Sequence, residues 1–152
     1  ISPDGLFLTN GPGDPQEAAE GIETVKALVG ELPIFGVCMG HQVLALAMGG
    51  KTYKLKFGHR GGNHGVFDRE SGRSFIVAQN HGYAVDGDSL IFKGMEMVYI
   101  NLNDMSVEGM KHRSLPLFSV QFHPEACAGP EDTNMLFDKF IEMMGENNAK
   151  GQ

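Results

Sequence analysis

The chain has 152 residues, a length that supports one domain with its own hydrophobic core. Its net charge of -7 argues against nucleic acid or an anionic membrane surface as the main partner. Two cysteines are too few for a disulfide framework, which favours a reducing compartment, and no apolar run approaches the ~18 residues of a membrane span. We therefore expect a cytoplasmic protein.

The first third of the chain alternates short apolar runs with helical patterns. Residues 4–10 and 33–37 are predicted to be buried strands, because each is a short apolar run stopped by turn residues. Residues 16–29 have the pattern of an amphipathic helix that begins after Pro15, and residues 41–50 that of an apolar helix ended by two glycines. This order of strands and helices predicts parallel pairing through crossovers.

The rest of the chain turns to β. Five runs with strand character follow one another: "KTYKLKF", "SFIVAQN", "EMVYINL", "SVEGMKH" and "PLFSVQF". Residues 131–144 then predict a closing helix, and the polar residues 147–152 predict a flexible C-terminal tail. The pattern as a whole indicates an α/β protein whose sheet is covered by helices on both faces, with a β-rich excursion in the middle.

The stretch Gly36-Val37-Cys38-Met39-Gly40 has the G-x-nucleophile-x-G spacing of a nucleophile elbow, between a predicted strand and a predicted helix. The glycines permit a strained turn and close packing of the neighbouring chains. The following helix would direct its N-terminal amides at the sulfur, which favours the thiolate and lowers the thiol pKa from about 8.5. The alternative is a buried packing cysteine.

A cysteine nucleophile needs a base that also protonates the leaving group, and His123 is the best candidate of the six histidines. It follows a predicted buried strand, at the strand end where α/β sites gather. In an extended chain Glu125 would point the same way and could hold one ring nitrogen while the other faces Cys38, which is the arrangement of a catalytic triad. The alternative is a His-Pro-Glu surface turn.

The other histidines have weaker arguments. His41 could form a Cys-x-x-His metal pair with Cys38, but no second ligand pair has zinc-like spacing, so we expect no metal. His59 and His64 flank a glycine-rich loop, "RGGN", and His81 lies in a predicted loop after a strand. His112 is assigned to the surface and Cys127 to a loop, and neither residue is given a role.

Three motifs in this order, "NGPGDP", "GVCMGHQ" and "FHPE", resemble class I glutamine amidotransferase domains. The stretches "KTYKLKFGHRGGNHGV" and "AQNHGYAV" make the chain similar to the glutaminase domains of carbamoyl-phosphate synthetase small subunits, over roughly residues 4–144. The resemblance implies a flavodoxin-like α/β fold, with a mostly parallel sheet flanked by helices. It also implies one amidotransferase domain over residues 1–146, followed by the tail.

The start of the chain suggests that this domain is incomplete. The sequence opens almost directly on a predicted buried strand, which in a doubly wound fold is rarely the first. We therefore expect a fragment that lacks the first strands of the amidotransferase fold. The alternative is that Leu6–Leu8 forms an edge strand.

The resemblance assigns roles to individual positions. Cys38 would attack the side-chain amide of glutamine, His123 would carry the proton to departing ammonia, and Glu125 would orient His123. The oxyanion would bind to the backbone amides of Gly13 and Met39. The remaining positions that match the glutamine pocket are Gly11, Gln42, Asn80, Gly82 and Tyr83. Judged from the residues alone, Gln42 could also be a solvent-facing helical residue, and Asn80 and Gly82 could be plain turn residues of a hairpin.

The resemblance also implies partners. L-glutamine would be the substrate, and ammonia would pass to a synthetase large subunit that uses ATP, Mg²⁺ and bicarbonate for pyrimidine and arginine synthesis. The chain itself would need no cofactor, since it has no P-loop motif. Three alternatives remain open: an amidotransferase component of anthranilate or GMP type, a non-catalytic regulatory module, and a cysteine hydrolase or peptidase of the same fold.

Overall fold

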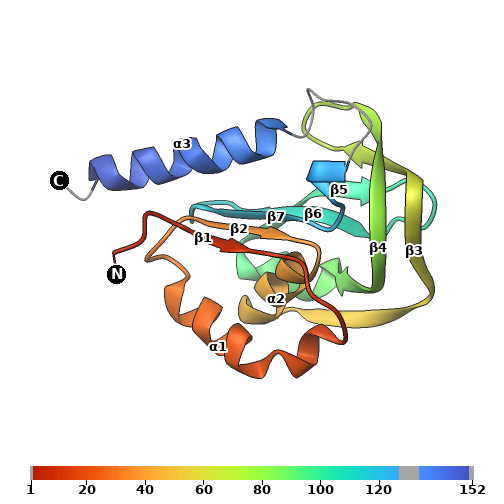
Figure 1. The fold of residues 1–152 in the computed structure, drawn as a ribbon, viewed down its shortest axis with the longest axis horizontal. Coiled ribbons are helices and arrows are strands. Elements are labelled where there is room, and N and C mark those ends of the chain that lie inside the picture. Colours follow the sequence, from red (N-terminus) through yellow and green to blue (C-terminus); the bar gives the residue numbers. More distant parts are fainter. Residues whose placement is uncertain (1, 127–133, 151–152) are drawn as a thin grey trace.

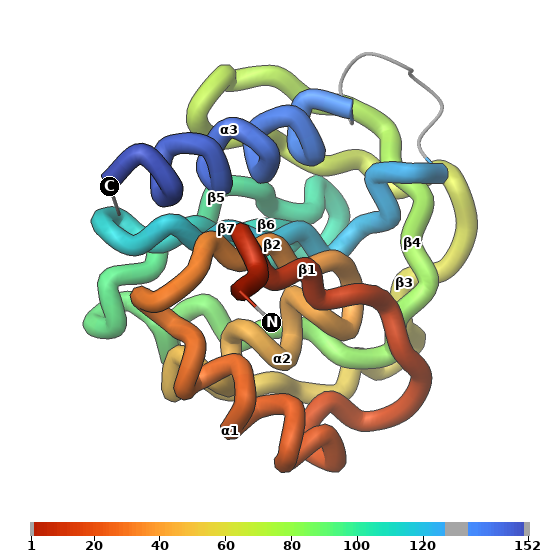
Figure 2. Tube along the Cα trace, turned by 60° about the vertical axis from the view of Figure 1, so that its left-hand side comes forward, coloured from red at the N-terminus to blue at the C-terminus, as the bar shows by residue number. Residues whose placement is uncertain are grey.

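The computed structural model describes residues 2–126 and 134–150. A seven-stranded sheet with the order β1-β2-β7-β6-β5-β3-β4 forms the middle layer. Helices α1 (Ala19–Leu28) and α2 (Met39–Ala47) cover one face, and α3 (Asn134–Lys150) lies across the other (Figures 1 and 2). The strands are β1 (Leu6–Leu8), β2 (Ile34–Val37), β3 (Lys51–Asp68), β4 (Ser74–Asp86), β5 (Met95–Asn101), β6 (Val107–His112) and β7 (Leu117–Val120).

The hydrophobic core has one part on each face of the sheet. Successive residues of β2 point to opposite faces, so Ile34 packs with Val25 and Leu44 under α1 and α2. Phe35 faces the other way and stacks on Phe118 with 4.4 Å between the ring centroids, beneath α3. A strand buried on both faces explains the continuous apolar run in the sequence.

The sheet is mixed, not mostly parallel as predicted. β2 pairs in parallel with β1 and with β7. All pairings from β7 through β6, β5 and β3 to β4 are antiparallel. The β-rich excursion therefore extends the same sheet instead of forming a separate layer, and the α/β character is confined to the half that carries the predicted elbow.

Two segments predicted as loops lie inside strands. The run "GHRGGNH" belongs to β3 and "NHG" belongs to β4, and the two strands form a long hairpin. Glycines at positive φ, Gly58 at 69° and Gly61 at 108°, coincide with the interruptions of the pairing register. They allow the hairpin to bend without ending, because a bulge inserts residues into one strand while the ladder continues. Turn-type residues therefore mark bulges here.

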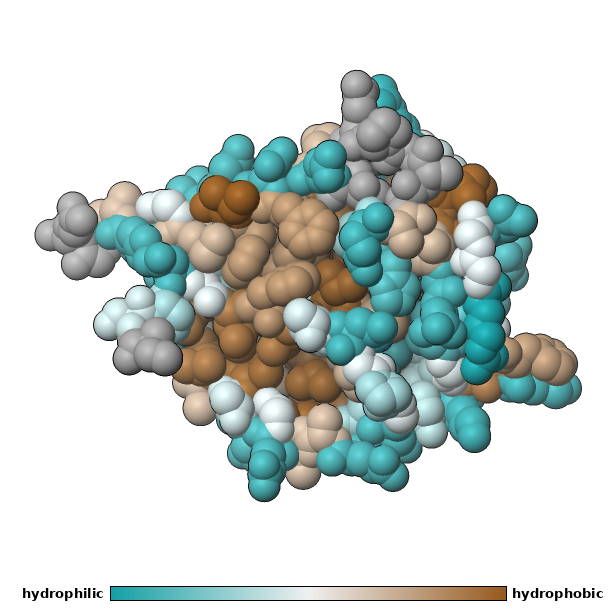
Figure 3. Space-filling model, viewed as in Figure 1, coloured by the Kyte–Doolittle hydropathy of each residue, from teal (hydrophilic) through white to brown (hydrophobic). Residues whose placement is uncertain are grey.

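The two ends of the described chain also differ from the prediction. β1, predicted to be a buried strand, lies at the edge of the described sheet, and its Phe7 is 41% exposed; missing first strands and an edge strand would both leave this edge open. Apolar side chains gather on the same side of the molecule, between α3 and α1 (Figure 3). α3 was predicted to end at Met144 but continues to Lys150, because nothing in "GENNAK" forces a helix to stop. Residues 147–150 are thus helical.

Candidate active site

Cys38 lies on a sharp turn between β2 and α2. Its backbone has φ 53° and ψ -105°, which is an unusual conformation for a non-glycine residue. The Cys38 amide donates to the carbonyl of Val120 at 2.9 Å, so the turn is fixed to the end of β7. The predicted nucleophile elbow is therefore present, and Cys38 itself holds the strained position.

The glycines on either side of Cys38 serve close packing. A Cβ atom on Gly36 would lie 2.7 Å from the carbonyl oxygen of Gly40, and one on Gly40 would collide with the carbonyl oxygen of Leu8. The helix start thus packs directly on β1 and on the end of β2. Neither glycine has a positive φ, so it is contact distance that excludes a side chain at these positions.

The environment of the thiol differs from the prediction. Cys38 is 3% exposed, and burial raises the pKa of its thiol to about 11. The backbone N–H of Met39 and the amide of Gln121 oppose this shift, whereas the carboxylates of Glu125 and Glu108 add to it. The predicted lowering of the pKa is thus wrong for the resting protein, because desolvation outweighs the helix N-terminus. The sulfur is a neutral thiol at pH 7.

His123 and Glu125 form the predicted pair. Nδ1 of His123 lies 3.0 Å from Oε1 of Glu125. The segment between them is not extended as predicted: Pro124–Ala126 is a single turn of 3₁₀ helix, η3, and this turn brings the carboxylate back to the ring. The backbone amide of His123 donates to Ala78 on β4 at 3.0 Å, which anchors the segment to the hairpin.

A cleft with a volume of about 500 Å³ opens beside Cys38. All the predicted substrate-binding residues line it, together with Cys38 and four further residues. The lining consists of Asn10, Gly11, Pro12, Gly13, Cys38, Met39, Gln42, Arg60, Asn80, His81, Gly82 and Tyr83. The loop after β1, the start of α2 and the β3–β4 hairpin each supply one wall, so segments far apart in sequence meet here.

Two donors for an oxyanion were predicted in this cleft. Met39 is the first residue of α2, and its amide has no acceptor within the helix, so it is directed toward the Cys38 sulfur. Gly13 has φ 94°, a conformation that turns the loop toward the cleft and that a residue with a side chain rarely adopts. Both lie in the lining of the cleft, where the prediction put them.

A chain of hydrogen bonds supports the sulfur from behind. Nε2 of Gln121 lies 3.8 Å from Sγ of Cys38, and its Oε1 accepts from Nε2 of Gln42 at 2.9 Å. Gln42 also donates to the carbonyl of Tyr83 at 2.8 Å, and the thiol of Cys38 lies 3.9 Å from the carbonyl of Asn80. Gln42 is therefore buried and bonded, which excludes the helical-surface alternative.

Gln121 and Arg60 were missed by the sequence analysis. Gln121 is a fully buried polar residue just before "FHPE", and an amide inside the predicted apolar run "PLFSVQF" is a detectable signal. Arg60 lies in β3 opposite Asn80 and is the one Lys or Arg side chain in the cleft lining, among the residues that the structure describes. Arg60 was not considered as a cleft residue because "RGGN" was assigned to a loop.

His41 is buried beneath the elbow and does not enter the cleft. Its Nδ1 lies 2.8 Å from Oγ of Ser119, and burial, together with His81, lowers its pKa to about 3. A neutral packing histidine accounts for this position. A Cys-x-x-His metal pair is not formed, because the ring bonds to β7.

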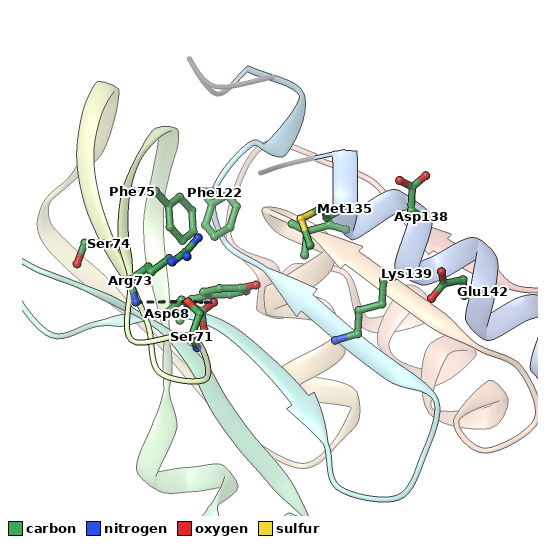
Figure 4. A pocket seen from close by; sticks show the side chains of 12 residues that line it. Asp68, Ser71, Arg73, Ser74, Phe75, Phe122, Met135, Asp138, Lys139 and Glu142 are labelled. Carbon is green, nitrogen blue, oxygen red and sulfur yellow. Dashed lines mark hydrogen bonds between the residues drawn. The ribbon is translucent and has the colours of Figure 1, made fainter. Parts of the chain in front are cut away.

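A second hollow, of about 540 Å³, lies between the β3–β4 hairpin and the start of α3. Phe75 and Phe122 form its apolar base, and Lys139 and Glu142 reach toward it from α3 (Figure 4). Cys38 and the predicted substrate-binding residues line the smaller cleft and not this hollow, so the smaller cleft is the candidate active site. Within the described ranges no helix is long and apolar enough to cross a membrane. Cys127 lies outside the described residues.

The family model described as glutamine amidotransferase class-I matches residues 1–143. The chain is 61% identical over 143 residues to the carbamoyl phosphate synthase small chain of Clostridium acetobutylicum, covering 94% of this chain and 41% of that protein. The small chain of Fusobacterium nucleatum is 57% identical over 150 residues, covering 99% and 42%. The chain thus spans about two fifths of the length of these curated relatives.

Two solved structures show the same fold. The glutaminase domain of Trypanosoma brucei CTPS, which was solved with bound acivicin, has a TM-score of 0.74 and 17% identity, and the match covers 94% of this chain and 71% of that one. A glutamine amidotransferase from Thermotoga maritima has a TM-score of 0.66 and 20% identity, covering 95% and 64%. At these identities the likeness establishes the fold alone.

Proposed function

The chain belongs to the class-I glutamine amidotransferase family, and on that basis we propose that it is the glutaminase component of a glutamine-hydrolysing carbamoyl phosphate synthetase. It hydrolyses glutamine to glutamate and ammonia. The observation that carries the proposal is the position of Cys38, on a strained elbow at the wall of a cleft that contains every predicted substrate-binding residue. The relatives named carbamoyl phosphate synthase small chain support the choice of pathway.

The first half-reaction forms a thioester. His123 accepts the proton from Sγ of Cys38 as the sulfur attacks the side-chain amide carbon of glutamine, and the C=O electron pair moves onto oxygen. The amides of Met39 and Gly13 stabilise this oxyanion. When the intermediate collapses, the C–N bond breaks and His123 gives its proton to the departing nitrogen. Ammonia leaves, and a γ-glutamyl thioester remains on Cys38.

The second half-reaction releases glutamate. A water molecule attacks the thioester carbon, and His123 accepts a proton from that water. Collapse of the second intermediate breaks the C–S bond, and the proton returns to the sulfur. Glu125, 3.0 Å from Nδ1 of His123, orients the ring and stabilises its charged form in both halves.

The raised pKa of Cys38 makes His123 essential to the first step. With a pKa of about 11 the sulfur carries a proton at rest, so attack on the substrate has to be coupled to proton transfer. A resting thiol also resists oxidation and adventitious alkylation, which depend on the thiolate. The enzyme thus generates its nucleophile when glutamine and His123 are in place.

The cleft is suited to a free α-amino acid. Carbonyl groups and the side-chain amides of Gln42 and Asn80 offer acceptors for an ammonium group, and Arg60 supplies a guanidinium for a carboxylate. The binding of the two charged groups would place the side-chain amide of glutamine against Cys38. This arrangement favours free glutamine over peptides, whose α-groups are neutral amides.

We assign the remaining chemistry to a partner. The large synthetase subunit receives the ammonia and uses ATP, Mg²⁺ and bicarbonate to make carbamoyl phosphate. We also propose a cytoplasmic location, because two cysteines are too few for a disulfide framework.

The proposal is tested in the complete synthetase with Cys38→Ala. Glutamine hydrolysis should fall by about 10³-fold or more, since triad members act as a unit, while synthesis of carbamoyl phosphate from added ammonia should persist. Cys127→Ala is the matched control and should retain both activities. Loss of glutaminase activity in Cys127→Ala but not in Cys38→Ala would refute the assignment. Turnover of small peptides in preference to free glutamine would identify a hydrolase instead.

A further inference from the structure

A cluster of buried titratable side chains lies where the β3–β4 hairpin approaches β6. His59 comes from β3, His81 from β4 and Glu108 from β6, and all three are buried. One nitrogen or oxygen atom from each lies within 4.8 Å of the other two. The mechanism proposed above uses none of these groups. Since the three come from distant parts of the sequence, their spacing gives no ligand motif.

The outer nitrogens of both rings are occupied by oxygen acceptors. Nε2 of His59 lies 2.7 Å from Oδ2 of Asp104, and Nδ1 of His81 lies 2.6 Å from the carbonyl oxygen of Tyr83. A carbonyl and an ionised carboxylate can only accept, so the ring proton lies on this outer nitrogen in each case. When both rings are neutral, the inner nitrogens, Nδ1 of His59 and Nε2 of His81, are therefore lone-pair donors. Metal-binding histidines are oriented by the same kind of outer hydrogen bond.

The amide of Gln79 lies between the two inner nitrogens. Its Oε1 is 3.0 Å from Nδ1 of His59 and 2.7 Å from Nε2 of His81, and its buried Nε2 has no hydrogen-bond partner among the described residues. Reversing the amide would let Nε2 donate to both rings but would leave Oε1 in the unpartnered position. Either orientation therefore leaves one buried polar atom unsatisfied, which native proteins rarely tolerate.

Glu108 adds a buried carboxylate to this cluster. It is fully buried, and its Oε1 accepts from Asn101 at 2.8 Å and lies 3.5 Å from Nδ1 of His59. Its Oε2 has no hydrogen-bond partner in the part of the chain that the structure describes. A buried carboxylate requires a nearby cation, because the interior solvates it poorly. A cation between the two inner nitrogens and the carboxylate, beside the Gln79 amide, would meet these lone pairs at once.

We propose that Nδ1 of His59, Nε2 of His81 and the carboxylate of Glu108 bind a zinc ion, with Oε1 of Gln79 as the fourth ligand. Two histidines and one glutamate form a zinc donor set found in proteins, and bonds of about 2.0–2.1 Å place tetrahedral ligand atoms about 3.3 Å apart. The 3.5 Å between His59 and Glu108 already fits this spacing. The ligand atoms that lie up to 4.8 Å apart have to move inward, and Oε1 of Gln79, 3.0 and 2.7 Å from the two nitrogens, has to move slightly away from them.

The ion would have a structural role beside the active site. It would join β3, β4 and β6 behind the wall of the cleft that His81 lines. From His81 the contacts continue through the carbonyl of Tyr83 to Gln42, and from there to Gln121 and the Cys38 sulfur. The site does not depend on the proposed reaction, because its ligands are identified by their own geometry.

A proton on His59 is the competing cation. The carboxylate of Glu108 raises the pKa of His59 to about 9, with Asp104 adding to the effect against burial, so a charged imidazolium could balance Glu108 without a metal. Zinc would displace that proton from Nδ1, since metal binding to histidine requires the neutral ring. The two alternatives differ in the zinc content of the protein and in whether Nδ1 of His59 carries a proton.

The test measures zinc in the natural full-length protein after growth in zinc-supplemented medium and gel filtration. One zinc ion per chain is expected in the wild-type protein, and about tenfold less or lower in Glu108→Gln and His59→Gln. His64→Gln is the matched control and should retain its zinc, since its ring lies 5.4 Å from that of His59 but outside the ligand set. Comparing variants separates this site from zinc bound elsewhere in the protein.

Cobalt provides a second measurement that does not depend on the folding of a variant. Wild-type protein produced with Co²⁺ should show the intense visible absorption of a tetrahedral ion. Equal zinc contents in wild type and a folded Glu108→Gln, or a zinc-free wild type without cobalt absorption, would overturn the proposal. In that case nitrogen NMR of His59 should show protons on both Nδ1 and Nε2. Failure of this test would leave the assignment of Cys38 untouched.

Discussion

The carbonyl oxygen of Gly40 lies 2.7 Å from the point that a Cβ atom on Gly36 would occupy, and the carbonyl carbon lies 2.8 Å from it. Real Cβ atoms essentially never approach backbone this closely. Gly36 therefore packs directly on the backbone of Gly40 across Cys38, whereas Gly40 itself leaves no room for a side chain because it packs on Leu8 of β1. The strained φ of 53° at Cys38 persists because this packing leaves the backbone no room to relax.

Gly36→Ala should destabilise the protein by about 1–3 kcal/mol and reduce glutamine turnover, because the added methyl group meets backbone rather than a flexible side chain. Thermal denaturation and steady-state kinetics measure the two effects. Gly145→Ala is the control: it lies in α3 with open space around it, and the better helix propensity of alanine should raise stability by about 0.5–1 kcal/mol. An unchanged melting temperature in Gly36→Ala would contradict the packing argument.

The sequence predicts the elbow well because the elbow is local. The two glycines, the apolar strand before them and the helix after them occupy one continuous stretch. The His123 and Glu125 pair is likewise local, although the backbone that joins them is a 3₁₀ turn and not an extended segment. Side chains two residues apart can meet in either conformation. The local pattern therefore predicts the pair but not its backbone.

Properties set by distant residues could not be predicted. The thiol pKa is raised mainly by burial, and Glu108 on β6 contributes, so no stretch around Cys38 contains the cause. The course of the β3–β4 hairpin was also missed, because glycines at bulges have the same sequence signature as glycines in loops. Arg60 was overlooked for this reason, and Gln79 was placed in a predicted strand without a role. Their importance depends on partners that only the folded sheet brings near.

The pH dependence of alkylation tests the state of the Cys38 thiol. Because burial raises its pKa to about 11, the thiolate fraction in the resting protein should keep rising with each pH unit through 9 and toward 10. In a Cys127→Ser background, the rate of iodoacetamide modification should rise over this range without levelling. Circular dichroism checks that the fold survives at the alkaline end. A plateau near pH 8 would show that the resting thiol has an ordinary or lowered pKa.

Glu125→Gln should reduce glutamine turnover less than His123→Asn does, because Glu125 orients and stabilises whereas His123 moves the proton. The same Glu125→Gln change should lower the pKa of Cys38, since the carboxylate charge contributes to its upward shift. Steady-state rates and the alkylation profile are measured on the same samples. Equal losses of turnover in the two variants, or an alkylation profile that moves to higher pH, would contradict the assigned roles.

Arg60→Met should raise the KM for glutamine by about tenfold with little change in kcat, because an ion pair with the substrate α-carboxylate contributes to binding rather than to the reaction. Arg60 lines the cleft, and its guanidinium is held toward β3 by a 3.0 Å bond to the carbonyl of Phe57. Lys56→Met is the matched control, since Lys56 is an exposed cation of the same strand that does not line the cleft.

Glutaminamide, which lacks the α-carboxylate, completes the test of Arg60. The wild-type protein should use it with a higher KM than glutamine, and Arg60→Met should no longer distinguish the two compounds. The loss of the difference would isolate the pairing of guanidinium and carboxylate, because a general distortion of the cleft would weaken both substrates alike. If Arg60→Met instead kept the full preference for glutamine, the carboxylate would have to bind to the backbone amides of the hairpin, and Arg60 would have no part in recognition.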